Sequence, residues 1–114
     1  MEASPQGQGG FTISTRTDGA RVSVDVAGDL DIATADQLTT QLEQLDVPQN
    51  GEIVVDLSGV GFMDSTGLRI MIAANRKAGE AGHGFTVVTG ESPARRVFEL
   101  TRMDEHIRVV DELS

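Results

Sequence analysis

Residues 51–68 read GEIVVDLSGVGFMDSTGL, and they carry the strongest indication of fold class in this chain. The β-branched and aliphatic run at 53–57 is nearly continuous and is bounded by glycines. Such a run is typical of a strand buried on both faces, and strands of this kind occur mainly in parallel sheets. Residues 58–64 predict a loop, and the apolar spacing that follows predicts a helix over 66–77. The stretch therefore predicts one strand–loop–helix unit of a parallel sheet.

The sequence on either side extends this unit to a complete domain. Alternating apolar residues on both sides of Asp18-Gly19 predict an N-terminal β-hairpin with a tight turn. Thr34, with Gln37 three residues later, has the pattern of a capping box at a helix start. The predicted elements are strands at 11–17 and 20–27, a helix at 35–45, a strand at 53–57, a helix at 66–77, a strand at 85–88, a helix at 93–101 and a strand at 107–110.

The order β-β-α-β-α-β-α-β predicts a single α/β domain with a mixed, mostly parallel sheet and helices packed against it. The chain has 114 residues, which is enough for one domain. Residues 1–10 hold no periodic apolar pattern and predict a disordered tail, which leaves 11–114 for the domain. No apolar run has the length of a membrane helix or the position of a signal peptide, so we expect a cytoplasmic protein.

Composition and net charge exclude several kinds of site and partner. Cysteine is absent and the two histidines are His83 and His106, so we expect no disulfide and no metal site. The net charge of −9 argues against nucleic acid and anionic membrane as partners. The excess lies in residues 18–64, which carry ten acidic residues and one basic residue. An acidic surface of this kind either maintains solubility or attracts a basic partner.

Ser65 falls at the expected start of the helix after the central strand. A serine at this position commonly caps the helix by accepting a hydrogen bond from its free amides. The alternative is a modification site, because a phosphoryl group on Ser65 would lie at the positive end of the helix dipole. Phe62 and Met63, two large apolar residues in the predicted loop, favour this alternative, since exposed apolar side chains can anchor a partner.

Three segments resemble one known family. They are GDLDIATADQL at 28–38, DLSGVGFMDSTGLRIMI at 56–72 and ARRVFELTRMDEHIRVVDEL at 94–113. They are similar to the corresponding segments of bacterial anti-sigma factor antagonists, which are STAS-domain proteins. The resemblance covers roughly residues 11–113, and the predicted order of strands and helices is also the order of that family's fold.

The resemblance implies a phosphorylation switch. In the family, the unphosphorylated antagonist binds an anti-sigma factor and frees a sigma factor. The anti-sigma factor is an ATP-dependent serine kinase that phosphorylates the serine matching Ser65, and a PP2C-type phosphatase resets the switch. Thr66 is a second candidate acceptor. We expect a monomer, and the implied partner-binding residues are Asp29, Asp31, Thr34, Phe62, Met63, Asp64, Ser65, Thr66 and Gly67.

Other functions of this stretch are alternatives. An esterase nucleophile at Ser65 would need a glycine two residues earlier, where this chain has Met63. A phosphate-binding loop would need a Gly-Lys-Ser/Thr sequence, and the single lysine is Lys77, at the far end of the predicted helix. We therefore expect no catalytic residue and no cofactor. Within the same family, the alternative function is a STAS scaffold or regulatory module of a stress-sensing complex without a sigma-releasing role.

Overall fold

The structure is a computed structural model that describes residues 10–113, so the tail predicted at 1–10 lies, apart from Gly10, outside the described residues. The predicted order of strands and helices is confirmed, with one additional short 3-10 helix before the last strand. The elements are β1 (Thr12–Asp18), β2 (Arg21–Leu30), α1 (Ala35–Glu43), β3 (Glu52–Met63), α2 (Ser65–Glu80), β4 (Gly84–Val88), α3 (Pro93–Thr101), η1 (Met103–Glu105) and β5 (Arg108–Val110).

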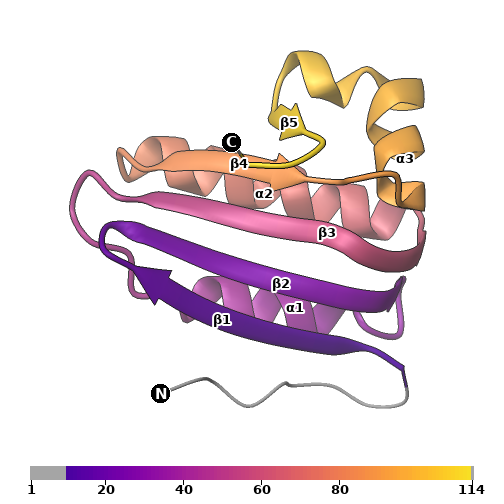
Figure 1. The fold of residues 1–114 in the computed structure, drawn as a ribbon, viewed down its shortest axis with the longest axis horizontal. Coiled ribbons are helices and arrows are strands. Elements are labelled where there is room, and N and C mark those ends of the chain that lie inside the picture. Colours follow the sequence, from indigo (N-terminus) through magenta and orange to yellow (C-terminus); the bar gives the residue numbers. More distant parts are fainter. Residues whose placement is uncertain (1–9, 114) are drawn as a thin grey trace.

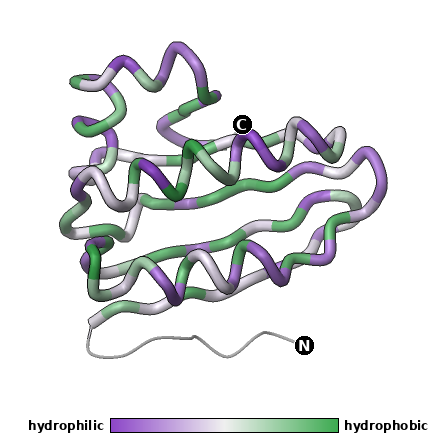
Figure 2. The backbone as a smooth tube through the Cα atoms, turned by 180° about the vertical axis from the view of Figure 1, so that it is seen from behind, coloured by the Kyte–Doolittle hydropathy of each residue, from purple (hydrophilic) through white to green (hydrophobic). Residues whose placement is uncertain are grey.

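The five strands form one mixed sheet in the order β1-β2-β3-β4-β5. β1 pairs with β2 antiparallel, and the three later pairs are parallel, as the crossover pattern predicts. Every crossover moves to the next strand in the same direction, and right-handed crossovers then place their helices on one face of the sheet. Figure 1 shows α1 and α2 behind the strands, and Figure 2 shows the same two helices from their own side.

The core lies between the sheet and the helix layer. The inward-facing side chains Val24, Val55 and Val87 are fully buried, and α3 adds Ala94 and Phe98 to the same core. Burial of each large apolar side chain contributes about 1.5–3 kcal/mol to the free energy of folding. The one continuous core supports the prediction of a single α/β domain.

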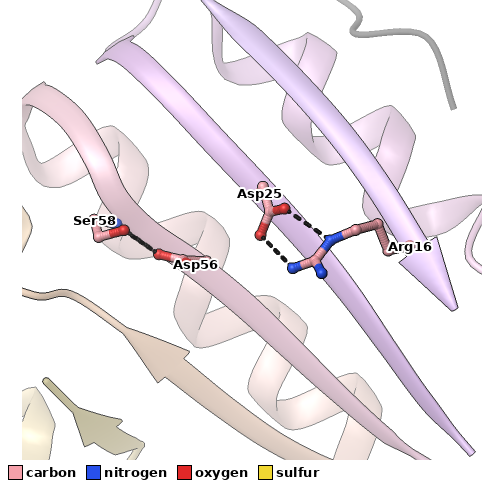
Figure 3. Close-up of polar contacts among 4 residues, drawn as sticks. All are labelled: Arg16, Asp25, Asp56 and Ser58. Carbon is pink, nitrogen blue, oxygen red and sulfur yellow. Dashed lines mark hydrogen bonds and ion pairs between the residues drawn. The ribbon is translucent and has the colours of Figure 1, made fainter. Parts of the chain in front are cut away.

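The opposite face of the sheet carries polar side chains. The Arg16 guanidinium donates to the Asp25 carboxylate at 3.1 Å across β1 and β2 (Figure 3). Arg21 and Glu52 form a second pair, 2.8 Å apart, between β2 and β3. Both pairs are partly exposed, so each contributes at most about 1 kcal/mol to the stability of the fold.

β3 is much longer than the predicted strand at 53–57, and the predicted loop at 58–64 is wrong. The second half of β3 continues to pair with β2 as far as Leu30 and Met63, through two irregularities in register. At the first of them, Asp56 Oδ1 accepts hydrogen bonds from the Ser58 amide at 2.9 Å and the Ser58 hydroxyl at 2.6 Å (Figure 3). The glycines and the irregular spacing hid this strand, because bulges break the alternation on which a strand prediction depends.

Three helix boundaries also differ from prediction. α1 ends at Glu43 instead of residue 45, and α2 runs from Ser65 to Glu80 instead of from residue 66 to residue 77. Gly79 lies inside the last turn of α2, where a glycine lowers helix stability without ending the helix. Sequence alone marks helix ends poorly when the residue past the boundary still tolerates helical geometry.

Candidate functional site

The candidate site lies where β2 and β3 end. Asp29 is paired with Phe62 and Leu30 with Met63, and the Asp64 amide donates to the Leu30 carbonyl oxygen at 3.4 Å. The segments around residues 28–34 and 58–67 therefore lie side by side. In open α/β sheets this carboxyl end of the parallel strands is where functional residues gather.

Ser65 is the first residue of α2 and is exposed. The cap of the helix is Asp64, whose Oδ1 accepts a hydrogen bond from the Thr66 amide at 2.9 Å. The prediction that Ser65 sits at the helix start is confirmed, but the capping role belongs to its neighbour. The Ser65 hydroxyl is thus at the positive end of the α2 dipole and outside the capping hydrogen bond.

Phe62 and Met63 point in opposite directions because successive strand residues alternate between faces. The Phe62 side chain is 48% exposed, whereas Met63 is 5% exposed and belongs to the core. The expectation of a surface anchor therefore holds for the position of Phe62 and is wrong for Met63. Met63 packs in the core beneath the exposed site residues, and it would have to leave the core to contact a partner.

Gly67 is buried against the end of the β2–β3 pair. A methyl group added at Gly67 would lie 2.8 Å from Leu30 Cγ and 3.1 Å from Met63 Cγ. This close approach brings the first turn of α2 onto the two strands. Gly67 therefore positions Ser65 through packing, and its burial keeps it from direct contact with a partner.

The loop from Asp29 to Thr34 is held by the Thr34 hydroxyl. This hydroxyl donates to the Asp29 carbonyl oxygen at 2.8 Å and accepts from the Asp31 amide at 3.1 Å. The predicted capping box of Thr34 with Gln37 is wrong, because the Thr34 side chain makes no capping hydrogen bond with α1. The Asp31 carboxylate accepts from the Ala33 amide at 3.0 Å, so the loop has a defined shape.

Ile32 is a surface residue of this loop that sequence reasoning missed. Its side chain is 82% exposed, the highest value among the exposed large apolar side chains of the described residues. The available signal was a single β-branched residue between Asp31 and Ala33 in an otherwise polar loop. Together with Phe62, Ile32 gives the site an apolar component that is exposed to solvent.

The site is acidic as well as apolar. The ion pairs found among residues 10–113 involve other carboxylates, so Asp29, Asp31 and Asp64 take part in none of them. Unpaired carboxylates around a partly apolar surface favour a basic partner and oppose further negative charge. Asp29 is exposed, and Asp31 and Asp64 are partly buried.

Neither a metal cluster nor a membrane-spanning helix is evident in the described part of the chain. Over residues 10–113, no three histidine or acidic side chains come together as metal ligands would. None of the helices in that range combines the length and hydrophobicity needed to cross a membrane.

Comparison with known proteins gives a consistent result. Residues 13–111 match the family model described as "Mlab, STAS domain". The anti-sigma-F factor antagonist RsfB of Mycobacterium tuberculosis is 31% identical over 90 residues, which are 79% of this chain and 73% of that protein. An anti-sigma-B factor antagonist of Listeria monocytogenes is 27% identical over 88 residues, 77% of each chain.

Solved structures agree with these matches. The crystal structure of an anti-sigma factor antagonist from Mycobacterium paratuberculosis superimposes with a TM-score of 0.81 and 31% identity, covering 90% of this chain and 87% of that one. The antagonist SpoIIAA in its unphosphorylated form has a TM-score of 0.67 and 18% identity, covering 88% and 89%, and so shares the fold.

Proposed function

This chain belongs to the STAS domain family, and we propose that it acts in the cytoplasm as an anti-sigma factor antagonist controlled by phosphorylation of Ser65. In its unphosphorylated form it binds an anti-sigma factor and so frees a sigma factor. Phosphorylation by the anti-sigma factor, which is an ATP-dependent serine kinase, ends this binding, and a PP2C-type phosphatase restores it. Ser65 carries the proposal: it is exposed at the N-terminus of α2 while Asp64 performs the capping.

The surroundings of Ser65 suit a protein interface. Phe62 and Ile32 provide exposed apolar contacts, and Asp29 and Asp31 provide charge beside them. Interfaces commonly combine buried apolar anchors with a polar rim, and a few anchors carry most of the binding free energy. The anti-sigma factor would therefore present basic and apolar side chains to this surface.

Phosphoryl transfer to Ser65 changes the charge of this surface. The Ser65 oxygen forms a bond to the γ-phosphorus of ATP, the bond from that phosphorus to its bridging oxygen breaks, ADP leaves, and the hydroxyl proton passes to a base on the kinase. The product carries about 1.5–2 additional negative charges at pH 7. At the partly apolar surface around Phe62 and Ile32, this group adds bulk, must lose its hydration on docking, and repels any partner carboxylate that lies opposite Ser65, so it opposes docking.

The expected loss of partner affinity on phosphorylation is estimated from typical coupling free energies between two sites. A coupling free energy of about 1–3 kcal/mol lowers affinity about 5- to 150-fold. This is sufficient for a switch and requires no large change of fold. The helix dipole stabilises the phosphate by about 0.3–1 kcal/mol, so the modified form keeps α2 intact.

Thr66 is the second candidate acceptor, and its surroundings make it the weaker one. Its amide is bound to Asp64 and its side chain is partly buried, whereas Ser65 is exposed. A kinase needs its acceptor hydroxyl to enter an active site, and the more exposed hydroxyl at the very start of α2 meets this need with less rearrangement.

The test uses affinity capture from source-cell lysate with wild type, Ser65→Ala and Ser65→Asp, read by mass spectrometry. Wild type and Ser65→Ala are expected to recover a small ATP-binding protein of kinase fold, and Ser65→Asp to recover much less of it. Thr40→Asp is a matched control, because it adds the same charge at an exposed position of α1. Equal recovery of large STAS proteins by all baits would favour the scaffold function instead.

A further inference from the structure

A concave site lies between α1 and α2 and reaches the first turn of α2 at Thr66. It is a groove of about 580 Å³, within the range of roughly 300–1,000 Å³ typical of small-molecule sites. Its lining extends from Thr66 of α2 to Ala81, the C-cap residue of that helix, about 22 Å at 1.5 Å per residue. The groove is therefore long, and Ser65 is not part of its lining.

The floor of the groove is formed by core residues that the helices leave incompletely covered. Ile53 of β3 and Phe85 of β4 are 9% and 8% exposed, while Val55 and Val87, the next inward-facing residues on the same strands, are 0% exposed. Ile53 and Phe85 are paired in register, so they form one continuous apolar surface beneath the two helices.

Small side chains on α2 leave the groove open. Ala73, Ala74 and Ala78 recur on the groove side of the helix, where larger residues would fill the space between α1 and α2. On the other side of the groove, apolar residues of the last turn of α1 and of the segment that follows it pack against the core but are only partly buried. These residues are Leu42, Leu45 and Val47.

The rim of the groove carries positive charge. Lys77 of α2 lies 3.6 Å from Glu43 of α1, and this pair bridges the two helices at the groove. Arg69 and His83 also line it, so the lining holds two cations and a histidine against one carboxylate. This contrasts with residues 18–64, where ten acidic residues face one basic residue.

We propose that this groove binds a small amphiphile with a linear apolar tail and an anionic head group, of the class of medium-chain fatty acids. The tail lies on Ile53, Phe85 and the α2 alanines, where it removes the exposed apolar floor from water. The carboxylate pairs with Lys77, whose exposed ion pair with Glu43 is weak enough to be exchanged.

The chain's own N-terminal segment suits the groove poorly. Residues 1–10 read MEASPQGQGG and include one large apolar side chain, Met1, so they lack the apolar length that the groove offers. A neutral ligand would leave the rim charges unused, and a cationic head group would meet two cations, Arg69 and Lys77, against the single carboxylate of Glu43. The long apolar lining of the groove suits a ligand with a linear apolar tail, and the cations at its rim suit an anionic head group.

The proposal is tested with dodecanoate, below the concentration at which it forms micelles, by calorimetry and by NMR of the backbone amides. Saturable one-to-one binding with shifts at Ile53, Ala74 and Phe85 is expected. Lys77→Gln should weaken binding about fivefold, the loss typical of one exposed charge pair. Arg76→Gln is the matched control, because Arg76 is the neighbouring exposed cation on α2 and does not line the groove.

Two further arms separate the alternatives. Ala74→Leu fills the groove with a good helix former and should abolish binding; if this variant fails to fold, the comparison of Lys77→Gln with Arg76→Gln still decides. Dodecylamine, with the same tail and a cationic head, should bind much more weakly. Equal binding of the two amphiphiles, shifts outside the groove, or shifts in the groove that depend only on protein concentration would overturn the proposal, the last by indicating a second copy of the chain as occupant.

Discussion

Asp64 caps α2 by accepting a hydrogen bond from the Thr66 amide at 2.9 Å, across the residue that lies between them. Ser65 is therefore presented at the helix N-terminus by a cap that does not use its hydroxyl. The same interaction couples the geometry of the site to the stability of the helix. This coupling can be measured separately from partner binding.

Replacing Asp64 with alanine should lower the free energy of unfolding by about 1 kcal/mol, because the α2 cap is lost. Asp64→Asn should remain close to wild type, since an asparagine side chain also accepts from the Thr66 amide. Urea denaturation of the three proteins measures the difference. Equal stability of Asp64→Ala and wild type would show that another group caps α2 in solution.

Two glycines of α2 should respond in opposite ways to alanine. Gly67→Ala places a methyl group 2.8 Å from Leu30 Cγ and should destabilise by about 1–3 kcal/mol through overpacking. Gly79→Ala meets no atom within 4 Å and should stabilise by about 0.5–1 kcal/mol through helix propensity. Thermal denaturation distinguishes them. A stabilised Gly67→Ala would contradict the tight packing of α2 on the β2–β3 pair.

Phe62 and Met63 should separate binding from stability. Phe62→Ala is expected to weaken binding to the captured anti-sigma factor by about 2 kcal/mol, or roughly 30-fold, as for an interface anchor, while its fold stability changes little. Met63→Ala should instead lower stability by about 2–5 kcal/mol, because its side chain is 5% exposed in the core. Surface plasmon resonance and denaturation measure the two effects.

Ile32 has a matched control on the same molecule. Ile32→Ala should weaken binding in the same assay, while Leu100→Ala should not, although both side chains are largely exposed at 82% and 72%. Leu100 lies on α3, outside the segments around residues 28–34 and 58–67 that form the candidate site. Equal effects of the two substitutions would place the interface elsewhere or extend it over α3.

Phosphorylation of Ser65 should leave the domain folded and slightly more stable. The phosphate lies at the α2 N-terminus, and Arg69 follows at the i+4 position on the same side of the helix. The expected gain is about 0.3–1 kcal/mol at low salt, and it should decrease as salt screens the charges. Denaturation of protein carrying phosphoserine at residue 65, with Arg69→Gln as comparison, measures it. Marked destabilisation would mean that local unfolding, and not surface repulsion, ends partner binding.

Local patterns carried most of the fold prediction. The apolar run at 53–57, the Asp18-Gly19 turn and the helical spacings predicted the element order correctly, because side-chain periodicity and turn chemistry depend on neighbouring residues. The direction of the crossovers then predicted a mostly parallel sheet, which the strand pairing confirms. The position of Ser65 at a helix start also followed from these local signals.

Tertiary pairing accounts for what these patterns missed. β3 extends to Met63 because β2 lies beside it and supplies backbone hydrogen bonds through two bulges, and no signal within residues 58–64 specifies that neighbour. The direction of Phe62 and Met63 depends on this pairing as well. Thr34 bonds within its own loop because Asp29 and Asp31 are held at the end of β2, which its capping-box pattern could not indicate.

The sequence by itself thus determined the kinds of elements, their order and the residues available for a switch at Ser65. Only the tertiary structure decided which of those residues are exposed, which one caps α2 and which are packed in the interior. It also decided that α1 and α2 leave a groove over Ile53 and Phe85. The reason is physical: exposure and close packing depend on atoms brought together from distant parts of the chain, whereas propensity depends on neighbours along it.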